Sequence, residues 1–365
     1  MKNKKNTTAL GVVGRFLKVL LCTLITAVVI ILLVRVGGKI YYSHTPKGGI
    51  NESLYVDING TKQWISIYGK DKNNPVLLYL HGGPGYSTSF MDYAFTRKWA
   101  DVYTVVTWDQ RAAGKSWLNN TKDTTPINLD IMMEDGREMT EFLRSHLGKD
   151  KISIIGHSWG SIYGAMLVQD HPEYYDCFIG TGMVVDLTKN EERYWEAARE
   201  WAKGNEEDEQ LIEKCASGEI PKLTREYYQV RQGMMDKYGY NISAEKSDYS
   251  IPATGFFNPY YSLWDWYRGM TGTAGSNPYQ AWDESEEFNS LSILDRTEYK
   301  VPYYNINGDM DYQANFELAQ DYFDIVKAPR KKMYYMKNMA HGLLEVRSSE
   351  FSDIVHEIAA MENAQ

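Results

Sequence analysis

The sequence predicts an α/β fold in which a mainly parallel sheet is covered by helices on both faces. Two observations lead to this prediction. Short apolar, β-branched runs alternate with longer segments whose apolar residues recur at helical spacing. Two of the short runs lead directly into glycine-rich turns, at His81–Gly85 and Gly156–Gly160. Such alternation builds a parallel sheet, and a functional site then lies at the carboxyl ends of its strands.

The first element we expect is a transmembrane helix over residues 16–36, a segment that is apolar apart from Lys18, Thr23, Thr26 and Arg35. A helix of this length rises about 31 Å, enough to cross a bilayer. More basic residues precede or open the segment than follow it: Lys2, Lys4, Lys5, Arg15 and Lys18, against Arg35 and Lys39. The positive-inside rule then predicts a cytoplasmic N-terminus (residues 1–15) and a catalytic domain outside the cell membrane.

A cleaved signal peptide, giving a secreted protein, is the main alternative for this segment. Signal peptides usually have a shorter apolar region that ends at a small-x-small site, and Val34–Gly38 matches such a site poorly. A buried helix of a soluble protein is a third interpretation. Cys22 follows Leu21, where a lipoprotein signal has a small residue, so it is expected to be an ordinary apolar membrane residue.

A linker at residues 37–52 is expected next, followed by the first part of the core at residues 53–185. Strands at Ser53–Ile58 and Gln63–Tyr68 should form a hairpin, because Asn59-Gly60 between them is typical of two-residue turns. The remaining elements expected here are strands at Pro75–Leu80, Val102–Thr107, Lys151–Ile155 and Cys177–Thr181, and helices at Leu129–Leu147 and Ser161–Asp170.

The alternation stops at about Asp186 and resumes near Tyr299. Segments with helical spacing and an aromatic stretch, Phe256–Tyr267, fill the interval. We therefore expect residues 186–298 to form a helical cap inserted after the sixth strand. Residues 299–365 should complete the core, with strands at Pro302–Asn307 and Lys332–Met336.

Ser158 is the expected nucleophile. It stands in a G-x-S-x-G sequence between a predicted strand and a predicted helix, and this turn holds a serine hydroxyl clear of the backbone. The turn at His81–Gly85 offers glycine amides that a tetrahedral oxyanion could approach. We expect the backbone N–H groups of Gly83 and Trp159 to form the oxyanion hole, where one donor is typically worth about 3 kcal/mol.

A serine nucleophile needs a histidine to take its proton and a carboxylate to orient that histidine. In hydrolases ordered serine, acid, histidine, the last two follow late strands of the sheet. His341 follows the last predicted strand and is the expected base among the seven histidines. Asp309 and Asp311 both follow the preceding strand, and Asp311 is the expected acid.

Five motifs together are similar to those of one enzyme family. They are His81–Gly85, Trp108–Arg111 with Gly114 and Ser116, Gly156–Ser161, Gly308 with Asp311, and Ala340–Gly342. Through them the chain resembles, from about residue 53 to its C-terminus, the proline iminopeptidases, which are serine aminopeptidases of the α/β-hydrolase fold. The resemblance implies a triad of Ser158, Asp311 and His341 and the release of N-terminal residues, proline among them, from short peptides.

The chain departs from this family at four positions. His157 stands where the family often has a second glycine, Ala112 where it usually has glycine, Asp309 where it has arginine, and Asn315 where it has proline. These changes leave the expected triad in place and weaken the implication of proline preference.

Composition excludes several other classes. A net charge of −9 without a basic face argues against nucleic-acid binding. Cys22, Cys177 and Cys215 lie far apart, so neither a disulfide framework nor a zinc site is indicated, and we expect no metal or cofactor. The oligomeric state cannot be read from the sequence.

An aminopeptidase needs a carboxylate to hold the substrate's α-ammonium. Glu192, Glu196 and Asp265 are weak candidates, because charged stripes on a helix, such as Glu192, Glu196 and Glu200, are usually solvated. Three functions therefore remain open. They are an anchored aminopeptidase, an esterase or other acyl hydrolase with the same triad, and a non-catalytic binding protein on a hydrolase scaffold.

Overall fold

The computed structural model describes residues 3–222, 224–241, 247–272 and 278–364. Its centre is an eight-stranded sheet with strand order β1-β2-β4-β3-β5-β6-β7-β8. Pairing is parallel from β4 through β8, whereas β1–β2 and β2–β4 are antiparallel. The strands are β1 (Ile50–Ile58), β2 (Thr61–Gly69), β3 (Val76–Leu80), β4 (Thr104–Asp109), β5 (Ile152–His157), β6 (Tyr175–Thr181), β7 (Tyr303–Gly308) and β8 (Lys331–Met336).

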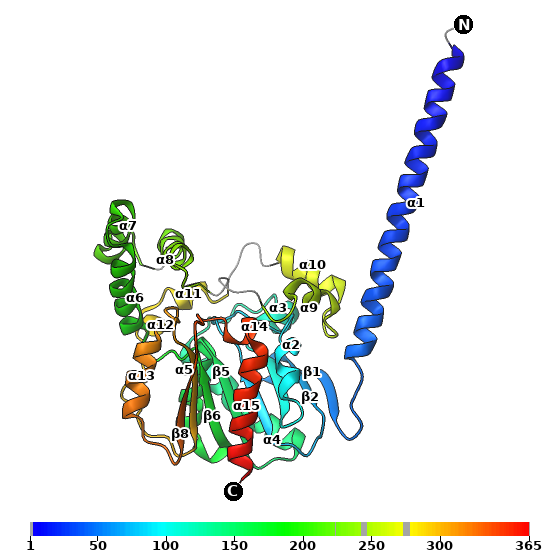
Figure 1. The fold of residues 1–365 in the computed structure, drawn as a ribbon. Coiled ribbons are helices and arrows are strands. Elements are labelled where there is room, and N and C mark those ends of the chain that lie inside the picture. The colour runs from blue at the N-terminus through cyan, green and yellow to red at the C-terminus, as the bar shows by residue number, and fades with distance from the viewer. Residues whose placement is uncertain (1–2, 223, 242–246, 273–277, 365) are drawn as a thin grey trace.

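Helices cover both faces of this sheet, as Figure 1 shows. The first face packs against α4 (Leu129–Leu147), α5 (Trp159–Asp170) and α13 (Phe316–Ile325). The second packs against α2 (Tyr93–Thr96), the 3₁₀ helix η1 (Arg97–Trp99), α14 (Leu343–Val346) and α15 (Ser348–Asn363). Residues of β3 and β4 are buried throughout, because helices lie on both sides of them. The predicted fold class is confirmed.

The local sequence explains where the β1–β2 hairpin turns and where helix α4 begins and ends. Asn59 and Gly60 both have positive φ, 41° and 78°, as a two-residue hairpin turn requires. Helix α4 has the predicted bounds: the Asn128 side chain accepts a hydrogen bond from the Ile131 N–H at 2.9 Å, and Gly148 ends the helix with φ 62°. A short helix, α3 (Gly114–Asn119), and the 3₁₀ helix η2 (Pro172–Tyr174) lie in the remaining loops.

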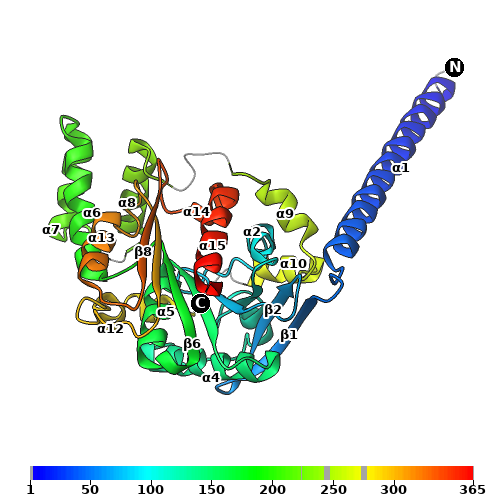
Figure 2. The ribbon, with the colours of Figure 1, turned by 60° about the horizontal axis from the view of Figure 1, so that its bottom comes forward.

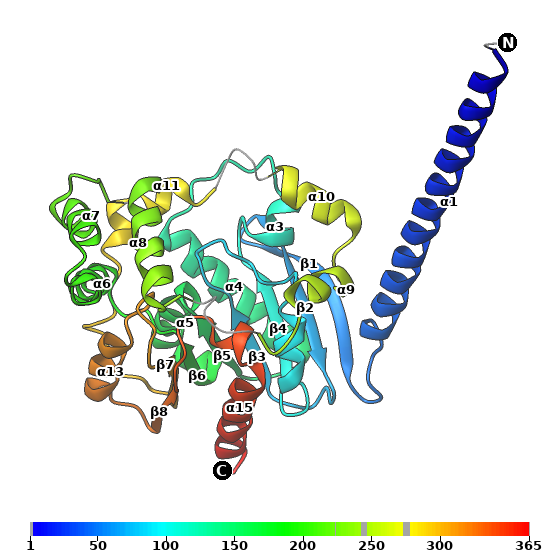
Figure 3. The same cartoon turned by 45° about the horizontal axis from the view of Figure 1, so that its top comes forward.

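The segment between β6 and β7 is helical, as predicted. It contains α6 (Leu187–Ala202), α7 (Glu206–Ser217), α8 (Arg225–Tyr238), α9 (Ile251–Phe257), α10 (Leu263–Gly272), α11 (Gln280–Asp283) and α12 (Glu286–Asn289). Helices α6 to α8 form a small apolar core of their own, which includes Tyr194, Trp195, Ile212 and Met234. We call residues 186–298 the cap. Figure 3 shows α6–α8 on one side of it and α9–α10 on the other.

The N-terminal helix α1 (Asn3–Tyr42) projects away from the core (Figures 1 and 2). It runs six residues past the expected end at Val36, and β1 begins three residues earlier than expected, so the expected linker is mostly helix and strand. Within the described residues, Gly11–Tyr42 is the one helix with the length and composition of a membrane span, and signal sequences meet the same criteria.

Candidate active site

Ser158 occupies a strained turn between β5 and α5. Its φ is 55° and its ψ −123°, a conformation that non-glycine residues rarely adopt. The flanking glycines make the turn possible. A Cβ on Gly156 would lie 2.0 Å from the Gly160 carbonyl oxygen, and one on Gly160 would lie 2.2 Å from the Leu80 carbonyl oxygen. The sequence G-x-S-x-G therefore forms the sharp strand-to-helix turn that its motif predicts.

His341 and Asp311 lie together at the carboxyl ends of β8 and β7. The His341 Nδ1 donates a hydrogen bond to Asp311 Oδ2 at 2.8 Å. The other oxygen of Asp311 accepts from the backbone N–H groups of Gln313 and Ala314 at 3.0 and 2.9 Å. Asp309 instead accepts from the Asn338 N–H at 2.6 Å. The structure thus joins Asp311, and not Asp309, to the histidine.

The Asp311 contact sets the protonation of His341. Burial alone would lower the pKa of His341, but the charge of Asp311 and the hydrogen bond to it raise this pKa above its usual value of 6.5. Because Asp311 accepts at Nδ1, the neutral ring leaves Nε2 as an acceptor. The two imidazole rings of His157 and His341 pack with centroids 4.7 Å apart. Burial, with His341 nearby, holds the pKa of His157 well below 6.5, so His157 adds no charge.

The glycine loop after β3 lies directly against the serine. A Cβ on Gly82 would lie 3.0 Å from Ser158 Cβ and 3.6 Å from its Oγ. Gly83 has a φ of 114°, which an L side chain would rarely adopt. The N–H of Trp159 is the first amide of α5, where a helix leaves its N–H groups without intrahelical acceptors. These two N–H groups are the predicted oxyanion donors.

His81 and Gln110 hold this loop, and neither was assigned a role from its motif. The His81 Nδ1 donates to the Gly82 carbonyl at 2.8 Å, while Nε2 accepts from the Gln110 N–H at 3.3 Å. Burial lowers the pKa of His81 to about 4, so the ring is neutral. The Gln110 side chain donates to the His81 carbonyl at 3.1 Å and accepts from the Trp159 indole at 3.0 Å. Gln110 therefore connects the glycine loop to the serine turn.

None of the three carboxylates named as ammonium candidates lies unpaired and buried. Glu192 and Glu196 are exposed on α6. The Asp265 carboxylate accepts from the Ser262 N–H at 2.8 Å, where it caps α10, and pairs with Lys115 at 3.9 Å. Two other cap carboxylates are less exposed than Glu192 and Glu196. Glu191 binds Arg231 at 3.0 Å, and Asp283 has a buried Oδ1 with no hydrogen-bond partner.

The cap is hydrogen-bonded to the turn that carries Asp311. Arg231 on α8 is buried, and its Nη1 donates to Gln313 Oε1 at 2.7 Å. Asn190 on α6 donates to the Gln313 carbonyl at 3.0 Å and accepts from the Asn315 N–H at 2.7 Å. Since the Gln313 N–H binds Asp311, two cap helices reach the acid through one residue.

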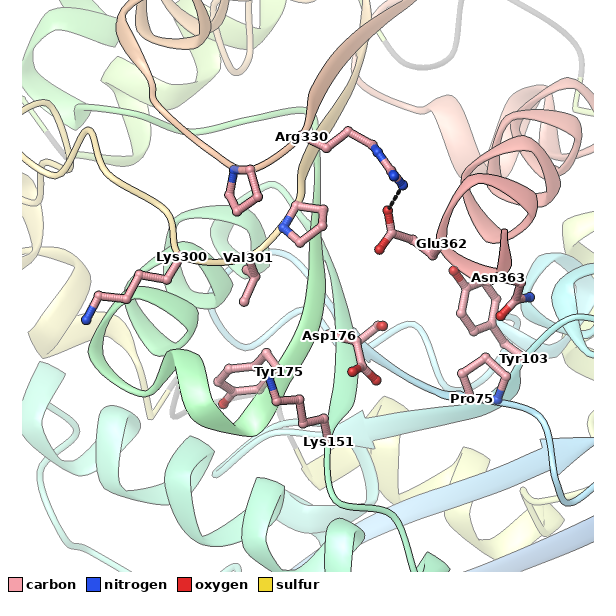
Figure 4. Close-up of a pocket in the computed structure, with 13 residues that line it drawn as sticks. Pro75, Tyr103, Lys151, Tyr175, Asp176, Lys300, Val301, Arg330, Glu362 and Asn363 are labelled. Atoms are coloured by element: carbon pink, nitrogen blue, oxygen red, sulfur yellow. Dashed lines mark hydrogen bonds and ion pairs between the residues drawn. The ribbon is translucent and has the colours of Figure 1, made fainter. Parts of the chain in front are cut away.

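A hollow of about 600 Å³ lies at the opposite end of the sheet (Figure 4). Residues just before strands line it, such as Pro75 before β3, Lys151 before β5 and Pro302 before β7. Arg330 and Glu362 pair at its edge at 2.8 Å. Because Ser158 and His341 follow the carboxyl ends of the strands, this hollow is separate from the candidate active site.

Comparisons with known proteins agree with this fold. The profile of the alpha/beta hydrolase fold family matches residues 75–312. A probable aminopeptidase of Bacillus subtilis, YbaC, is 25% identical over 299 residues, covering 78% of this chain and 89% of the relative. The proline iminopeptidase of Saccharolobus solfataricus is 36% identical over 124 residues, covering 33% of this chain and 37% of the relative. The crystal structure of proline iminopeptidase from Mycobacterium smegmatis covers 86% of this chain and 99% of its own, with a TM-score of 0.61 and 18% identity.

Proposed function

The chain belongs to the α/β-hydrolase fold family, and we propose that it is a serine hydrolase with Ser158 as nucleophile, His341 as base and Asp311 as acid. The observation that carries the proposal is the 2.8 Å hydrogen bond from His341 to Asp311. It leaves Nε2 of the histidine free to accept a proton, and the ring of His341 packs on that of His157, the residue before the serine in its strained turn.

In the proposed reaction, Ser158 Oγ attacks the acyl carbon and its proton passes to His341 Nε2. The negative oxygen accepts hydrogen bonds from the Gly83 and Trp159 N–H groups. His341 then protonates the leaving amine or alcohol as the acyl–enzyme forms. Water, deprotonated by the same histidine, attacks the ester and releases the acid together with Ser158.

We propose that the acyl donor is a short peptide whose N-terminal residue is released. Support comes from the relatives, one named a probable aminopeptidase and another a proline iminopeptidase. Proline as the released residue rests on matches to proline iminopeptidases that cover about a third of this chain.

An esterase or other acyl hydrolase is the second candidate, and one observation favours it. The carboxylates first considered for the substrate's ammonium group are exposed or already paired. An enzyme whose substrates lack a free amine would not need an unpaired carboxylate to bind an ammonium group.

Labelling with a fluorophosphonate tests the nucleophile. The wild-type chain should be labelled, and Ser158→Ala should lose the label while its thermal unfolding is unchanged. Because the probe reacts only with an activated serine, no labelling of the wild type would instead support a non-catalytic scaffold. Labelling of another serine in the Ser158→Ala variant would refute the assignment.

The substrate class is tested by comparing three substrates of one amino acid: a free-amine amide, its N-acetylated amide and a simple ester. An aminopeptidase should hydrolyse the free-amine amide and discriminate against the acetylated one. Equal turnover of both amides would exclude an ammonium-binding site, and turnover of the ester alone would favour the second candidate.

We further propose that α1 is an uncleaved membrane anchor. Large apolar side chains are exposed along it from Val12 to Val34, with no covering from the described chain. Exposed apolar surface of this extent is stable in a bilayer and unfavourable in water.

A further inference from the structure

One face of α10 carries three large side chains that stand out from the cap. Leu263 is 55% exposed, Trp264 63% and Tyr267 52%. The rings of Trp264 and Tyr267 stack with centroids 5.2 Å apart. The helix itself is held on the molecule, because Trp266 packs on Phe90 with centroids 5.8 Å apart. We call Leu263, Trp264 and Tyr267 the α10 face.

Helix α1 is docked on the chain segment that leads into α10. Arg35 is only 4% exposed; its Nη2 donates to the Tyr261 carbonyl at 2.8 Å, and a second nitrogen donates to the Phe256 carbonyl at the end of α9. Lys39 donates to the same Tyr261 carbonyl at 3.0 Å. A Cβ on Gly38 would overlap the Phe257 ring, so only glycine permits this contact. The two cations thus bind carbonyls of the cap next to the end of the apolar helix.

The end of α1 also contacts the core. The rings of Tyr42 and Tyr93 pack edge to face with centroids 4.8 Å apart, and the Arg97 guanidinium lies 5.6 Å from the centre of the Tyr42 ring. Contacts to the cap and to α2 together fix the direction in which α1 leaves the domain. Figures 1 and 3 show that it rises on the side where the cap lies, with α9 and α10 near its base.

These contacts define where the α10 face lies relative to a bilayer. The apolar stretch of α1 gives way to Arg35 and Lys39, and both of these bind beside the start of α10. Tryptophan and tyrosine concentrate at the boundary between hydrocarbon and headgroups, where the ring is partly apolar and its polar group stays hydrated. An exposed Trp-Tyr pair next to the end of a membrane helix fits that boundary.

We propose that the α10 face inserts into the headgroup region of the same bilayer that α1 spans, so that the cap rests on the membrane. The proposal depends on α1 being the anchor proposed above. It orients the whole domain: the carboxyl ends of the strands, where Ser158 and His341 lie, face the membrane surface.

A fluorescent label at position 263 tests the proposal on the full chain. The background is Cys22→Ser, because burial raises the pKa of Cys177 to about 12 and that of Cys215 to about 11, which leaves both thiols unreactive. Leu263→Cys carries an environment-sensitive label, and Ile325→Cys on α13, which is 54% exposed against 55% for Leu263, is the matched control. Both proteins are placed in vesicles of phosphatidylcholine and phosphatidylglycerol.

We expect nitroxide-bearing lipids to quench the label at 263 at least threefold more than the label at 325, and aqueous iodide to do the reverse. Adding Trp264→Ser and Tyr267→Ser should abolish the difference and leave fluorophosphonate labelling of Ser158 unchanged. Equal quenching at 263 and 325 would overturn the proposal. So would a label at 263 that is shielded in native membranes but not in pure vesicles, since a protein partner would then cover the face.

A third label distinguishes this failure from failure of the anchor. The thiol of Cys22 lies within α1 and is exposed. If lipid quenches a label at Cys22 but not at 263, α1 spans the bilayer and the α10 face does not touch it. If lipid quenches neither, the anchor itself is wrong.

Discussion

At the scale of single residues, the candidate site depends on a backbone conformation at Ser158 that non-glycine residues rarely adopt. A non-glycine residue at positive φ costs of order 1–3 kcal/mol, and Ser158 has a φ of 55°. The surrounding structure leaves no alternative, because Gly156 and Gly160 allow strand and helix to meet more closely than any side chain would permit. The strain therefore marks the position where a nucleophile is expected.

The choice between two aspartates gives the first prediction at this scale. Asp311→Asn should lower turnover by about 10³- to 10⁴-fold, as removal of a triad acid typically does. Asp309→Asn is the matched control and should cost little, since its carboxylate binds the Asn338 N–H rather than His341. Steady-state kinetics on both variants measure the effect, and a larger loss from Asp309→Asn would transfer the role.

Asp283 gives the second prediction at the residue scale. Burial, and then the charge of Glu284, raises the pKa of Asp283 to about 7, and its Oδ1 has no partner. The side chain stands on α11 next to Trp282, whose ring packs on Trp159 with centroids 5.2 Å apart. An ammonium group would stabilise this carboxylate. Asp283→Asn should raise KM for a free-amine substrate roughly 10- to 100-fold and leave an N-acetylated ester unaffected.

The exposed neighbour Glu284 is the control for Asp283, and Glu284→Gln should change neither substrate. If Asp283→Asn altered both substrates equally, the residue would support the fold of the cap rather than bind an amine. Kinetics with both substrates on both variants separate these outcomes.

The sequence identifies the residues whose chemistry lies in a local motif. Ser158, His341 and the two aspartates can be named because each follows a predicted strand in a fixed chain order. His81 and Gln110 cannot be assigned roles in this way. Their hydrogen bonds join the loop after β3 to the loop after β4, and a single sequence carries no signal for contacts between such distant segments.

At the scale of elements, the cap is more than a cover, because α6 and α8 both bind the turn that holds Asp311. Helical spacing predicts that these helices exist. The stripe of Glu192 and Glu196 is exposed, as expected for a charged stripe, but the sequence does not predict that the adjacent Glu191 pairs with Arg231. The extension of α1 to Tyr42 was also not predictable from helical spacing. It depends on Arg35 and Lys39, whose acceptors on α9 and on the segment before α10 come near only in the folded chain.

This arrangement predicts that the cap tunes the base. The positive charge of Arg231 lowers the pKa of His341, against the stronger raising effect of Asp311. The base must be neutral to accept a proton, so activity is lost as the pH falls through this pKa. Arg231→Met removes a cation, raises the pKa of His341, and should move the acidic limb of kcat/KM to higher pH by up to about one unit.

Arg231→Lys keeps the positive charge, so the acidic limb of kcat/KM should stay at its wild-type pH even where the hydrogen bond to Gln313 is lost. Loss of the cap fold alone would lower turnover at every pH without moving the limb. A limb that moved to lower pH in Arg231→Met would contradict the prediction. The pH profile and thermal unfolding of the three proteins are the measurements.

At the scale of the whole molecule, the chain combines an apolar helix with a domain whose cap lies on the side toward which that helix rises. Length and apolar composition allowed the helix to be predicted from sequence. Its position on the domain was not predictable, because it depends on the buried Arg35 and the contact of Gly38 with Phe257. An intact helix makes those contacts, whereas cleavage before Gly38 would remove Arg35 and leave the Tyr261 carbonyl with Lys39 alone.

The last prediction concerns this anchor. The chain purified from host membranes should keep its N-terminus, as intact-mass measurement reports, and protease added to intact spheroplasts should digest the catalytic domain. The excess of basic residues before the apolar segment favours that orientation. A soluble product that begins near Gly38 would identify a cleaved signal peptide. Protection in spheroplasts with digestion in inverted vesicles would reverse the orientation, because the domain would then lie on the cytoplasmic side with its cap against the inner leaflet.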